Sequence, residues 1–135
     1  MKKKKSRTLS SLKKSLDTIF SRYIRLKDAN QNGFVECYTC GVKKPWKQVD
    51  AGHFQSRRYL ATRWNELNVK PQCKKCNIFN NGEQYTFGKL LDVREKEGTS
   101  DKLYSLARTT VKYMRCDYEE MIEYYKIKVE KLLDE

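Results

Sequence analysis

The sequence predicts an α+β fold in which a small β-containing core lies between helices, and three observations support this prediction. A helical pattern comes first along the chain, short extended segments surround two cysteine pairs in the middle, and helical patterns return near the end. With 135 residues the chain can form one domain with a modest hydrophobic core. We divide it into a basic N-terminal arm with an amphipathic helix (1–33), the core (34–82) and a C-terminal helical region (83–135).

The N-terminal helix is predicted from apolar residues that recur every three or four positions. The pattern predicts a helix from about Leu9 to Lys27, and the polar segment from Asp28 to Gly33 ends it. The apolar stripe is formed by Leu9, Leu12, Leu16, Ile19, Phe20, Tyr23 and Ile24.

The core is predicted to contain short extended segments and one short helix. Phe34 to Cys40 is typical of a strand, and Trp46 to Ala51 of a second extended segment. Gly52 to Glu66 has no clear period and many polar residues, which indicates a loop. A short helix is expected from about Lys74 to Phe79, because two asparagines and a glycine follow it.

Three further helices are expected in the C-terminal region. Tyr85 to Lys96 stops before a glycine, and Ser100 to Tyr113 starts at a plausible capping residue. Tyr118 to Leu133 is preceded by Asp117, and Glu120 completes a pattern similar to a capping box.

Two Cys-x-x-Cys pairs, Cys37/Cys40 and Cys73/Cys76, stand 32 residues apart. Each pair can deliver two thiolates from one turn, and four thiolates complete the tetrahedral coordination of a structural zinc ion. Two disulfides or a redox-active dithiol are the alternatives, but no secretory leader is recognisable, so we favour Zn²⁺ in a reducing, cytoplasmic setting. Cys116 lies apart from both pairs and is expected to be a small buried hydrophobic residue.

The composition favours a polyanionic partner. The chain has 29 Lys and Arg against 17 Asp and Glu, a net charge of +12, which favours nucleic acid first and an anionic membrane surface second. No apolar run approaches the length of a membrane span, so we expect no insertion into a membrane. The residues from Lys2 to Lys5 could contact phosphates or form a solvated tail. Within the core we expect DNA contacts from Arg57, Arg58, Arg63, Lys70, Lys74 and Lys75.

Three residues of the core fit the chemistry of phosphodiester hydrolysis. His53, the only histidine, can act as a general base because an imidazole with an ordinary pKa of ~6.5 is largely neutral at physiological pH. Asn77 directly follows Cys76, so the zinc site would fix the position of an amide oxygen that could hold a hard divalent cation. Asn68 precedes a segment that could run back beside the strand of His53, where it could orient the imidazole. Each residue alone is weak evidence, since histidines and asparagines are often structural.

Their order along the chain resembles a known nuclease motif. The run Asn68-Val-Lys-Pro-Gln-Cys-Lys-Lys-Cys-Asn77, together with His53, resembles the HNH endonuclease motif in its H-N-N form. A more extended set of residues resembles the NinG (Rap) family of phage recombination nucleases, over roughly residues 37–133. This set consists of Ala51-Gly-His-Phe54, Arg63-Trp-Asn-Glu66, Gln72-Cys-Lys-Lys-Cys-Asn77 and Gly82.

The resemblance implies a zinc-stabilised ββα-metal core (the HNH or His-Me finger fold) and a metal-dependent endonuclease. Its expected substrate is branched DNA, such as D-loops or Holliday-type junctions, in the cytoplasm of the host cell. On this pattern His53 is the general base, Asn68 its orienting partner or a phosphate contact, and Asn77 a ligand of a catalytic Mg²⁺ or Mn²⁺. Symmetric cleavage of a junction would favour a homodimer.

One position departs from the HNH pattern. Many HNH motifs place a metal-binding Asp or His immediately before the catalytic histidine, and here Gly52 occupies that position. Asp50 is the nearest carboxylate, but three residues along an extended strand it is expected to face away from His53. Glu66 is another candidate ligand, or forms a salt bridge with Arg63. This departure supports an alternative, a noncatalytic zinc-containing protein that binds DNA as an accessory in recombination.

Loop aromatic residues add one further expectation. Phe54, Tyr59 and Trp64 could stack on unpaired bases, or they could pack beneath the loop.

Overall fold

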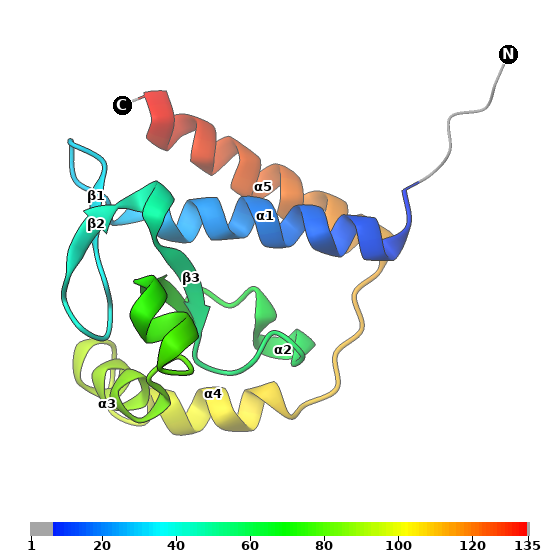
Figure 1. Cartoon of the computed structure of the whole chain (residues 1–135). Coiled ribbons are helices and arrows are strands. Elements are labelled where there is room, and N and C mark those ends of the chain that lie inside the picture. Colours follow the sequence, from blue (N-terminus) through cyan, green and yellow to red (C-terminus); the bar gives the residue numbers. More distant parts are fainter. Residues whose placement is uncertain (1–6, 135) are drawn as a thin grey trace, which may run out of the picture.

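The structure, a computed structural model, describes residues 7–134, so the predicted basic run from Lys2 to Lys5 lies outside the described residues. It is a mixed α/β protein with two small antiparallel sheets, as the sequence predicts (Figure 1). Its elements in chain order are α1 (Leu9–Lys27), β1 (Phe34–Glu36), β2 (Lys43–Pro45), the 3₁₀ turn η1 (Trp46–Gln48), β3 (Asp50–His53), α2 (Leu60–Arg63), β4 (Val69–Gln72), the π-helical turn η2 (Lys75–Phe79), α3 (Gln84–Arg94), α4 (Thr99–Ala107) and α5 (Arg115–Asp134).

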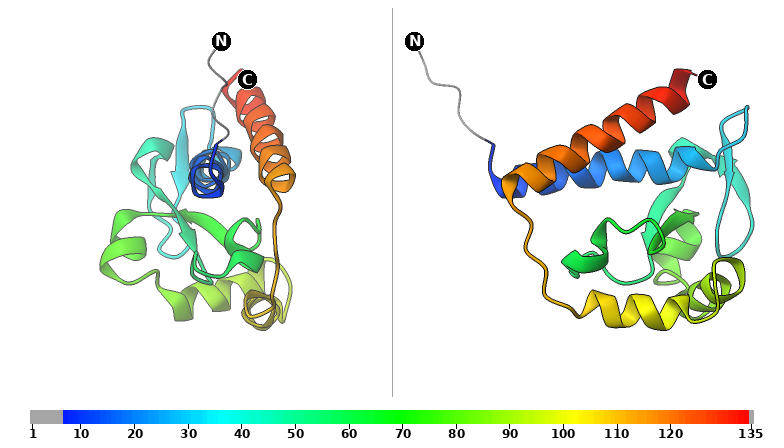
Figure 2. Two further views of the ribbon diagram at one scale, coloured as in Figure 1. Left: turned by 90° about the vertical axis from the view of Figure 1, so that its right-hand side faces the viewer. Right: turned by 180° about the vertical axis from the view of Figure 1, so that it is seen from behind.

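The two long helices, α1 and α5, lie side by side along one side of the molecule (Figure 2). The N-terminus of α1 is capped by Thr8, whose hydroxyl accepts a hydrogen bond of 3.0 Å from the Ser11 N–H. Each large apolar side chain buried between the helices contributes about 1.5–3 kcal/mol. The main cluster draws on all three predicted segments, which therefore share one core. Its buried members are Leu12, Leu16, Phe20, Ile24, Trp64, Val69, Tyr118 and Tyr125.

Two hairpins form the β structure. In the first, β1 pairs antiparallel with β2, with Phe34 opposite Pro45. In the second, β3 pairs antiparallel with β4, with Asp50 opposite Gln72 and His53 opposite Val69. The predicted strand after Asn68 therefore does run back beside the strand of His53. Helix α1 contacts both β3 and β4, so the N-terminal helix lies against the hairpin that carries the histidine.

Some predicted boundaries were wrong. The segment from Trp46 to Ala51 is split between η1 and β3, because Pro45 has no N–H with which to extend the β2 ladder. The predicted loop from Gly52 to Glu66 contains the end of β3 and the short helix α2. Helix α4 ends at Ala107 and not at Tyr113, since three consecutive β-branched residues, 109–111, disfavour helix.

The start of α5 also corrects two predictions. The helix begins at Arg115, and the Asp117 carboxylate reaches back to accept a 2.7 Å hydrogen bond from the Met114 N–H instead of capping a later start. Cys116 is exposed and not buried. It lies two residues, about 200° around the helix, from the buried Tyr118, so it points away from the core.

Within residues 7–134, no helix combines the length and the apolar character that crossing a membrane requires.

Candidate functional site

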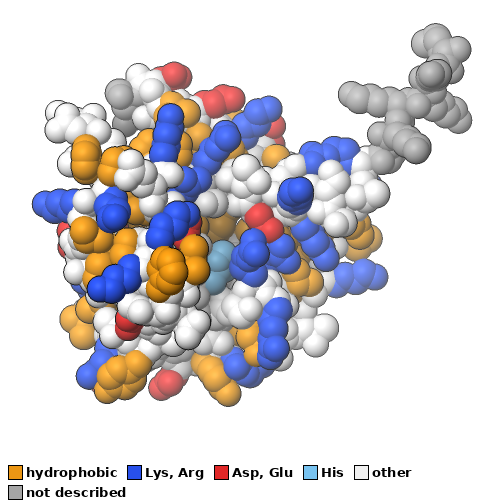
Figure 3. All heavy atoms as spheres, in the orientation of Figure 1, with side chains coloured by type: hydrophobic (Ala, Val, Ile, Leu, Met, Phe, Trp, Pro, Cys, Tyr) orange, Lys and Arg blue, Asp and Glu red, His pale blue; other side chains and the backbone are white. Residues whose placement is uncertain are grey.

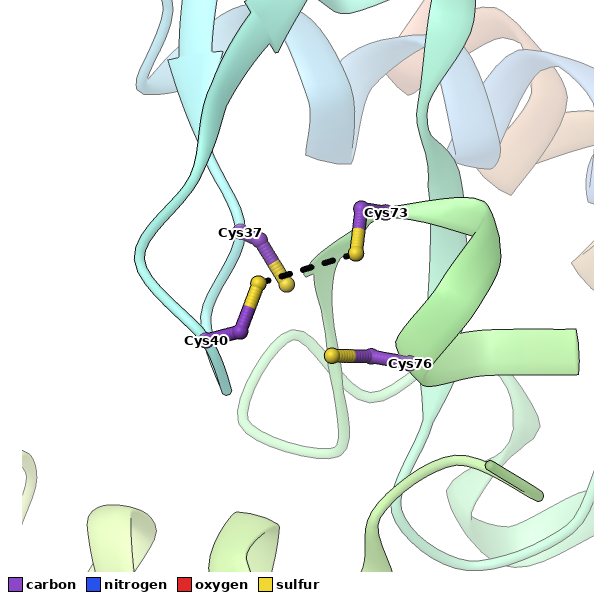
Figure 4. Close-up of side chains that lie close together, drawn as sticks. All are labelled: Cys37, Cys40, Cys73 and Cys76. Carbon is purple, nitrogen blue, oxygen red and sulfur yellow. Dashed lines mark hydrogen bonds between the residues drawn. The ribbon is translucent and has the colours of Figure 1, made fainter. Parts of the chain in front are cut away.

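The four cysteines of the two pairs come together in a cluster (Figure 4). Their sulfur atoms all lie within 4.8 Å of one another, and the Cys40 and Cys73 Sγ atoms are 3.7 Å apart. Four sulfurs bound tetrahedrally to zinc at ~2.3 Å are about 3.8 Å apart, so the donor type and the spacing both fit this ion. The four cysteines are therefore positioned to bind a metal ion, as predicted.

Local backbone geometry explains how the first pair forms its turn. Gly41 adopts φ = 81°, a left-handed conformation that glycine adopts without strain, and its N–H donates to the Cys37 carbonyl at 2.9 Å. The Cys37 N–H in turn donates to the Val42 carbonyl. Cys37 and Cys40 thereby face the second pair from one tight turn between β1 and β2.

The pKa values of the cysteines indicate that the four thiols need a bound cation in order to ionise together. Burial raises the pKa of Cys37, but hydrogen bonds from the Thr39 side chain and from nearby backbone N–H groups lower it to about 6. Burial instead raises the pKa of Cys76 to about 12. Four thiolates cannot be ionised together in this space without a compensating positive charge, which a metal ion supplies.

The turn η2 connects the cysteine cluster to a second, polar group of side chains. The Asn77 N–H donates to the Cys73 carbonyl at 3.0 Å, which ties the backbone of Asn77 to a cysteine of the cluster. The Asn77 side chain then donates through Nδ2 to Asp50 Oδ2 at 3.0 Å, and Lys74 forms an ion pair with the other oxygen of Asp50. The backbone of Asn77 is thus tied to the cysteine cluster, while its side chain is held by Asp50.

Asp50 and His53 both line one cavity, although they lie three residues apart on β3. Asp50 is the first residue of β3 and pairs with Gln72, which directly precedes Cys73. The chain turns into η2 at that point, and this turn brings Lys74 and Asn77 next to the first residue of β3.

His53 ends strand β3 and is half-buried. Its Nε2 lies 2.9 Å from the carbonyl oxygen of Arg63. A carbonyl oxygen can only accept, so Nε2 carries the hydrogen and Nδ1 is the unprotonated nitrogen of the neutral ring. Burial lowers the pKa of His53, and the positive charge of Arg57 acts in the same direction, while the Arg63 carbonyl opposes it. The imidazole is therefore neutral at pH 7.

Asn68 does not orient the imidazole directly. Its side chain is fully buried, accepting from the Gln55 N–H at 2.7 Å and donating to the Gln55 and Thr62 carbonyls at 3.0 Å. Among residues 7–134, no hydrogen bond joins Asn68 to the ring of His53, and the buried amide is out of reach of a phosphate. Asn68 instead holds the Thr62 carbonyl, and the residue after Thr62, Arg63, presents its own carbonyl to His53.

Gly52 leaves no room for a metal-binding side chain. A Cβ atom at this position would lie 1.8 Å from Oε1 of Gln72. The Gln72 side chain is itself fully buried and donates to Thr39 Oγ1 at 3.1 Å and to the Gly82 carbonyl at 2.9 Å. Gln72 thus fills the space that an Asp or His before His53 would need, which explains the departure from the HNH pattern.

A cavity of about 600 Å³ opens between α1, β3 and η2. His53, Asp50 and Asn77 line it from β3 and η2. The space-filling view shows the histidine in a hollow surrounded by Lys and Arg side chains (Figure 3). The structure therefore brings two of the three predicted catalytic residues together in a cavity open to solvent.

The six predicted DNA contacts differ in accessibility. Arg57, Arg58, Lys74 and Lys75 are exposed. Lys70, by contrast, is only 7% exposed, and its Nζ lies 3.0 Å from Glu95. It belongs to β4, in which every residue is buried, so contact with a phosphate would require this pair to break.

Arg63 is also engaged within the protein. Its guanidinium donates to both oxygens of Asp17 on α1, at 3.1 and 2.5 Å, and Trp64 Nε1 donates to the same carboxylate at 3.0 Å. The predicted alternative pair of Arg63 with Glu66 is wrong, because Glu66 lies 3.9 Å from Lys27.

Sequence reasoning missed the part that α1 plays in the cavity. Asp17, Ser21 and Arg25 line it from this helix. The one available signal was Asp17, an acid in an otherwise basic segment next to the buried Leu16. How close these α1 residues lie to β3 and α2 depends on tertiary packing, so the sequence pattern alone could not predict it.

The loop aromatics have mostly structural environments. Trp64 is 8% exposed and contacts Tyr118, and Phe54 packs against Phe87 with ring centroids 5.5 Å apart. Tyr59 is half-buried with the Arg58 guanidinium 4.7 Å from its ring. For Trp64 and Phe54, packing beneath the loop is the observed outcome.

These features define a mixed α/β protein in which a metal-binding cluster of four cysteines adjoins a polar cavity. A family model described as the bacteriophage lambda NinG protein matches residues 1–135. The chain therefore belongs to the NinG family, in agreement with the resemblance seen in its sequence. No curated protein and no solved structure matches the chain.

Proposed function

We propose that this chain is an HNH-type, metal-dependent DNA endonuclease that cleaves branched DNA during phage recombination. The observation that carries the proposal is the contact between His53 Nε2 and the Arg63 carbonyl at 2.9 Å. This contact fixes the tautomer in which Nδ1 can take a proton, and burial keeps the ring neutral. A half-buried histidine in a polar cavity with its tautomer fixed is what a general base requires.

In this proposal His53 acts on the attacking water. Nδ1 accepts a proton from the water as its oxygen attacks the scissile phosphorus, and the imidazolium that results is stabilised by the Arg63 carbonyl at Nε2 and by Asp17 nearby. Arg57, which also lines the cavity, can contact the phosphate. Asn68 acts as a positioning residue, because it holds the loop that places the Arg63 carbonyl.

The catalytic cation would be Mg²⁺ or Mn²⁺, held by Asn77 and Asp50. The amide oxygen of Asn77 and the carboxylate of Asp50 are hard oxygen donors, and both line the cavity that contains His53. In the structure the Lys74 ammonium pairs with Asp50. A positive charge can therefore reach this carboxylate from the cavity. A cation bound here supplies electrostatic stabilisation of the charge that develops on the leaving oxygen.

The structural metal would be Zn²⁺ in the cluster of Cys37, Cys40, Cys73 and Cys76. The order of β3, β4 and the helical turn η2 supports the assignment of a ββα-metal core, in which a hairpin is followed by a helix. Cys37 and Cys40 precede this hairpin, and Cys73 and Cys76 lie where it joins η2. Zinc in a four-cysteine site has no open position, so it fixes the backbone and takes no part in the chemistry.

DNA would bind over the exposed basic residues around the cavity, Arg57, Arg58, Lys74 and Lys75. These contacts neutralise phosphates, so affinity should fall steeply with salt concentration. Because phosphate contacts carry no sequence information, selection among substrates would depend on the shape of the DNA.

A second candidate function is that of a noncatalytic zinc-containing DNA-binding accessory in recombination. The ion pair between Lys74 and Asp50 favours it, because a catalytic cation must compete with an ammonium group already in place. This function needs the cysteine cluster and the basic surface but not His53.

A nicking assay distinguishes the two functions. Wild type and His53→Ala are compared on a four-way junction and on a matched linear duplex, with and without Mg²⁺. We expect Mg²⁺-dependent cutting of the junction by wild type only, with equal junction binding by both proteins. Cutting by the variant would contradict the assignment of the base, and binding without cutting by wild type would identify the accessory protein.

A further inference from the structure

The turn η2 displays two apolar side chains to solvent beside the cavity. Ile78 is 56% exposed and Phe79 is 78% exposed. Asn77 and Asn81, on either side of them in the chain, both line the cavity. Hydrophobic side chains lie near the histidine on the face seen in Figure 3. A phenylalanine exposed next to a candidate active site, where nothing in the fold requires it, is a candidate contact for a ligand.

The backbone around Phe79 is fixed on both sides. Before it, Cys76 belongs to the metal-binding cluster, and the Cys76 carbonyl accepts from the Gly82 N–H at 2.8 Å. After it, Asn81, Gly82 and Glu83 all have positive φ, at 53°, 86° and 50°. Left-handed conformations are costly for residues other than glycine, and they persist only where the surrounding contacts determine them. The ring of Phe79 is therefore held out from a rigid segment.

Along the chain around this pair, the charges are mainly positive. Lys74 and Lys75, at the start of η2, are exposed, and Lys74 also pairs with Asp50. On α3, Tyr85 is 78% exposed and carries the Lys89 ammonium 4.8 Å from its ring centroid. Glu83 is the one acidic residue between positions 74 and 89, and it is half-buried. The surface thus combines an exposed aromatic ring with cations.

An aromatic ring next to cations matches an anionic polymer that offers flat apolar faces. Nucleic acid has both properties, but in a duplex the faces of the bases are already stacked on one another. Only unpaired bases, such as those at a branch, can stack on a protein ring without the free-energy cost of first leaving the duplex stack. We propose that Phe79, flanked by Ile78, is a stacking platform for an unpaired base next to the scissile phosphate, and so selects branched DNA. This inference rests on the proposed function for its choice of DNA as the partner.

The test uses fluorescence and needs no cleavage. A junction carries 2-aminopurine at an unpaired position beside the branch, and binding is measured without Mg²⁺ in the His53→Ala background. The variants are Phe79→Ala, Phe79→Trp and the control Tyr124→Ala, which removes an exposed aromatic from α5. Phe79 is mostly exposed, so its variants should keep the unfolding temperature of the parent. Tyr124→Ala also removes an edge contact with the buried Tyr125, at 5.0 Å between ring centroids, so its unfolding temperature should fall slightly.

We expect Phe79→Ala to abolish the change in 2-aminopurine fluorescence and to weaken junction binding about tenfold, while duplex affinity stays within about twofold. Phe79→Trp should retain both signals, and Tyr124→Ala should behave like its parent. An equal loss on junction and duplex would overturn the platform, as would no loss on either.

Two further outcomes separate base stacking from membrane binding and from DNA cleavage. Weaker binding of Phe79→Ala to anionic phospholipid vesicles, with unchanged junction binding, would identify a membrane contact and overturn the inference. If wild type cuts no DNA but the Phe79-dependent fluorescence change is present, the nuclease proposal fails and the platform stands.

Discussion

The cysteine cluster and the His53 cavity meet at adjacent residues, Cys76 and Asn77, yet they are built in opposite ways. The cluster consists of four sulfurs in close contact, three of them on buried residues. The cavity is open to solvent, and its polar lining residues are held by hydrogen bonds and ion pairs, such as those of Asp50 with Asn77 and Lys74. The difference suggests a division of roles, in which coordination bonds to a metal in the cluster would fix the backbone, while the weaker contacts of the cavity leave the neighbouring side chains free to exchange partners.

Removing one sulfur should have the largest effect. Cys73→Ser should lose the bound zinc and unfold the central region, because structural zinc contributes about 10–16 kcal/mol in small domains, as much as a whole domain's stability. Zinc content and thermal unfolding measure this effect. Cys116→Ser is the matched control, since Cys116 is exposed and outside the cluster. If both variants bind zinc and melt like wild type, the cluster does not hold the fold.

Removing the imidazole should affect the chemistry and leave the cluster intact. His53→Ala should lower the single-turnover rate of junction cleavage by at least about 10²-fold, the usual contribution of a general base. Its zinc content should equal that of wild type. Loss of zinc in this variant would contradict the separation of the two regions, because it would show that the cavity and the cluster depend on one another.

Adding a methyl group at Gly52 should disturb both regions. Gly52→Ala places a Cβ 1.8 Å from Oε1 of Gln72. The Nε2 group of the same side chain donates to Thr39 beside the cluster. We expect a loss of about 1–3 kcal/mol in the free energy of unfolding, typical of overpacking.

A double variant tests whether Gln72 causes this loss. Gly52→Ala combined with Gln72→Ala should be less destabilised than the sum of the two single variants, as urea unfolding would measure. Additive losses would show that another neighbour of Gly52 carries the strain.

The smallest expected effect is on pH dependence. Burial lowers the pKa of His53, so below the ordinary value of about 6.5 the unfolded chain binds a proton that the folded protein does not. Stability should therefore decrease as the pH falls from 7 through the folded pKa, more in wild type than in His53→Ala. The cleavage rate should persist below pH 6.5 and fall at lower pH. A rate that falls already above pH 6.5 would contradict the lowered pKa.

The sequence predicted the features that depend on spacing along the chain. The period of α1, the cysteine pairs and the return of the strand after Asn68 all follow local patterns, and the structure contains them. The contact of Asp50 with Asn77 could not be predicted in this way, because it depends on how η2 packs against the start of β3.

The environments of two other predicted site residues also depend on tertiary packing. Asn68 was assigned to the imidazole from its position in a motif, yet its amide is used entirely by the backbone of the loop. Lys70 was assigned to DNA from its charge, but the burial of β4 and the pair with Glu95 decide its environment. Charge and residue type suggest a role, whereas burial determines whether the side chain is available for it.

The ion pair between Asp17 and Arg63 has a consequence for protein engineering. Arg63 binds α1 through its side chain and His53 through its carbonyl, so the N-terminal helix supports the residue that orients the histidine. A fragment cut to residues 34–82 would contain the four cysteines, His53 and Asn77, but it would lack this support and six of the eight buried residues of the main hydrophobic cluster. A fragment that folds on its own must therefore begin before Thr8 and include α5, because both long helices contribute to the main hydrophobic cluster.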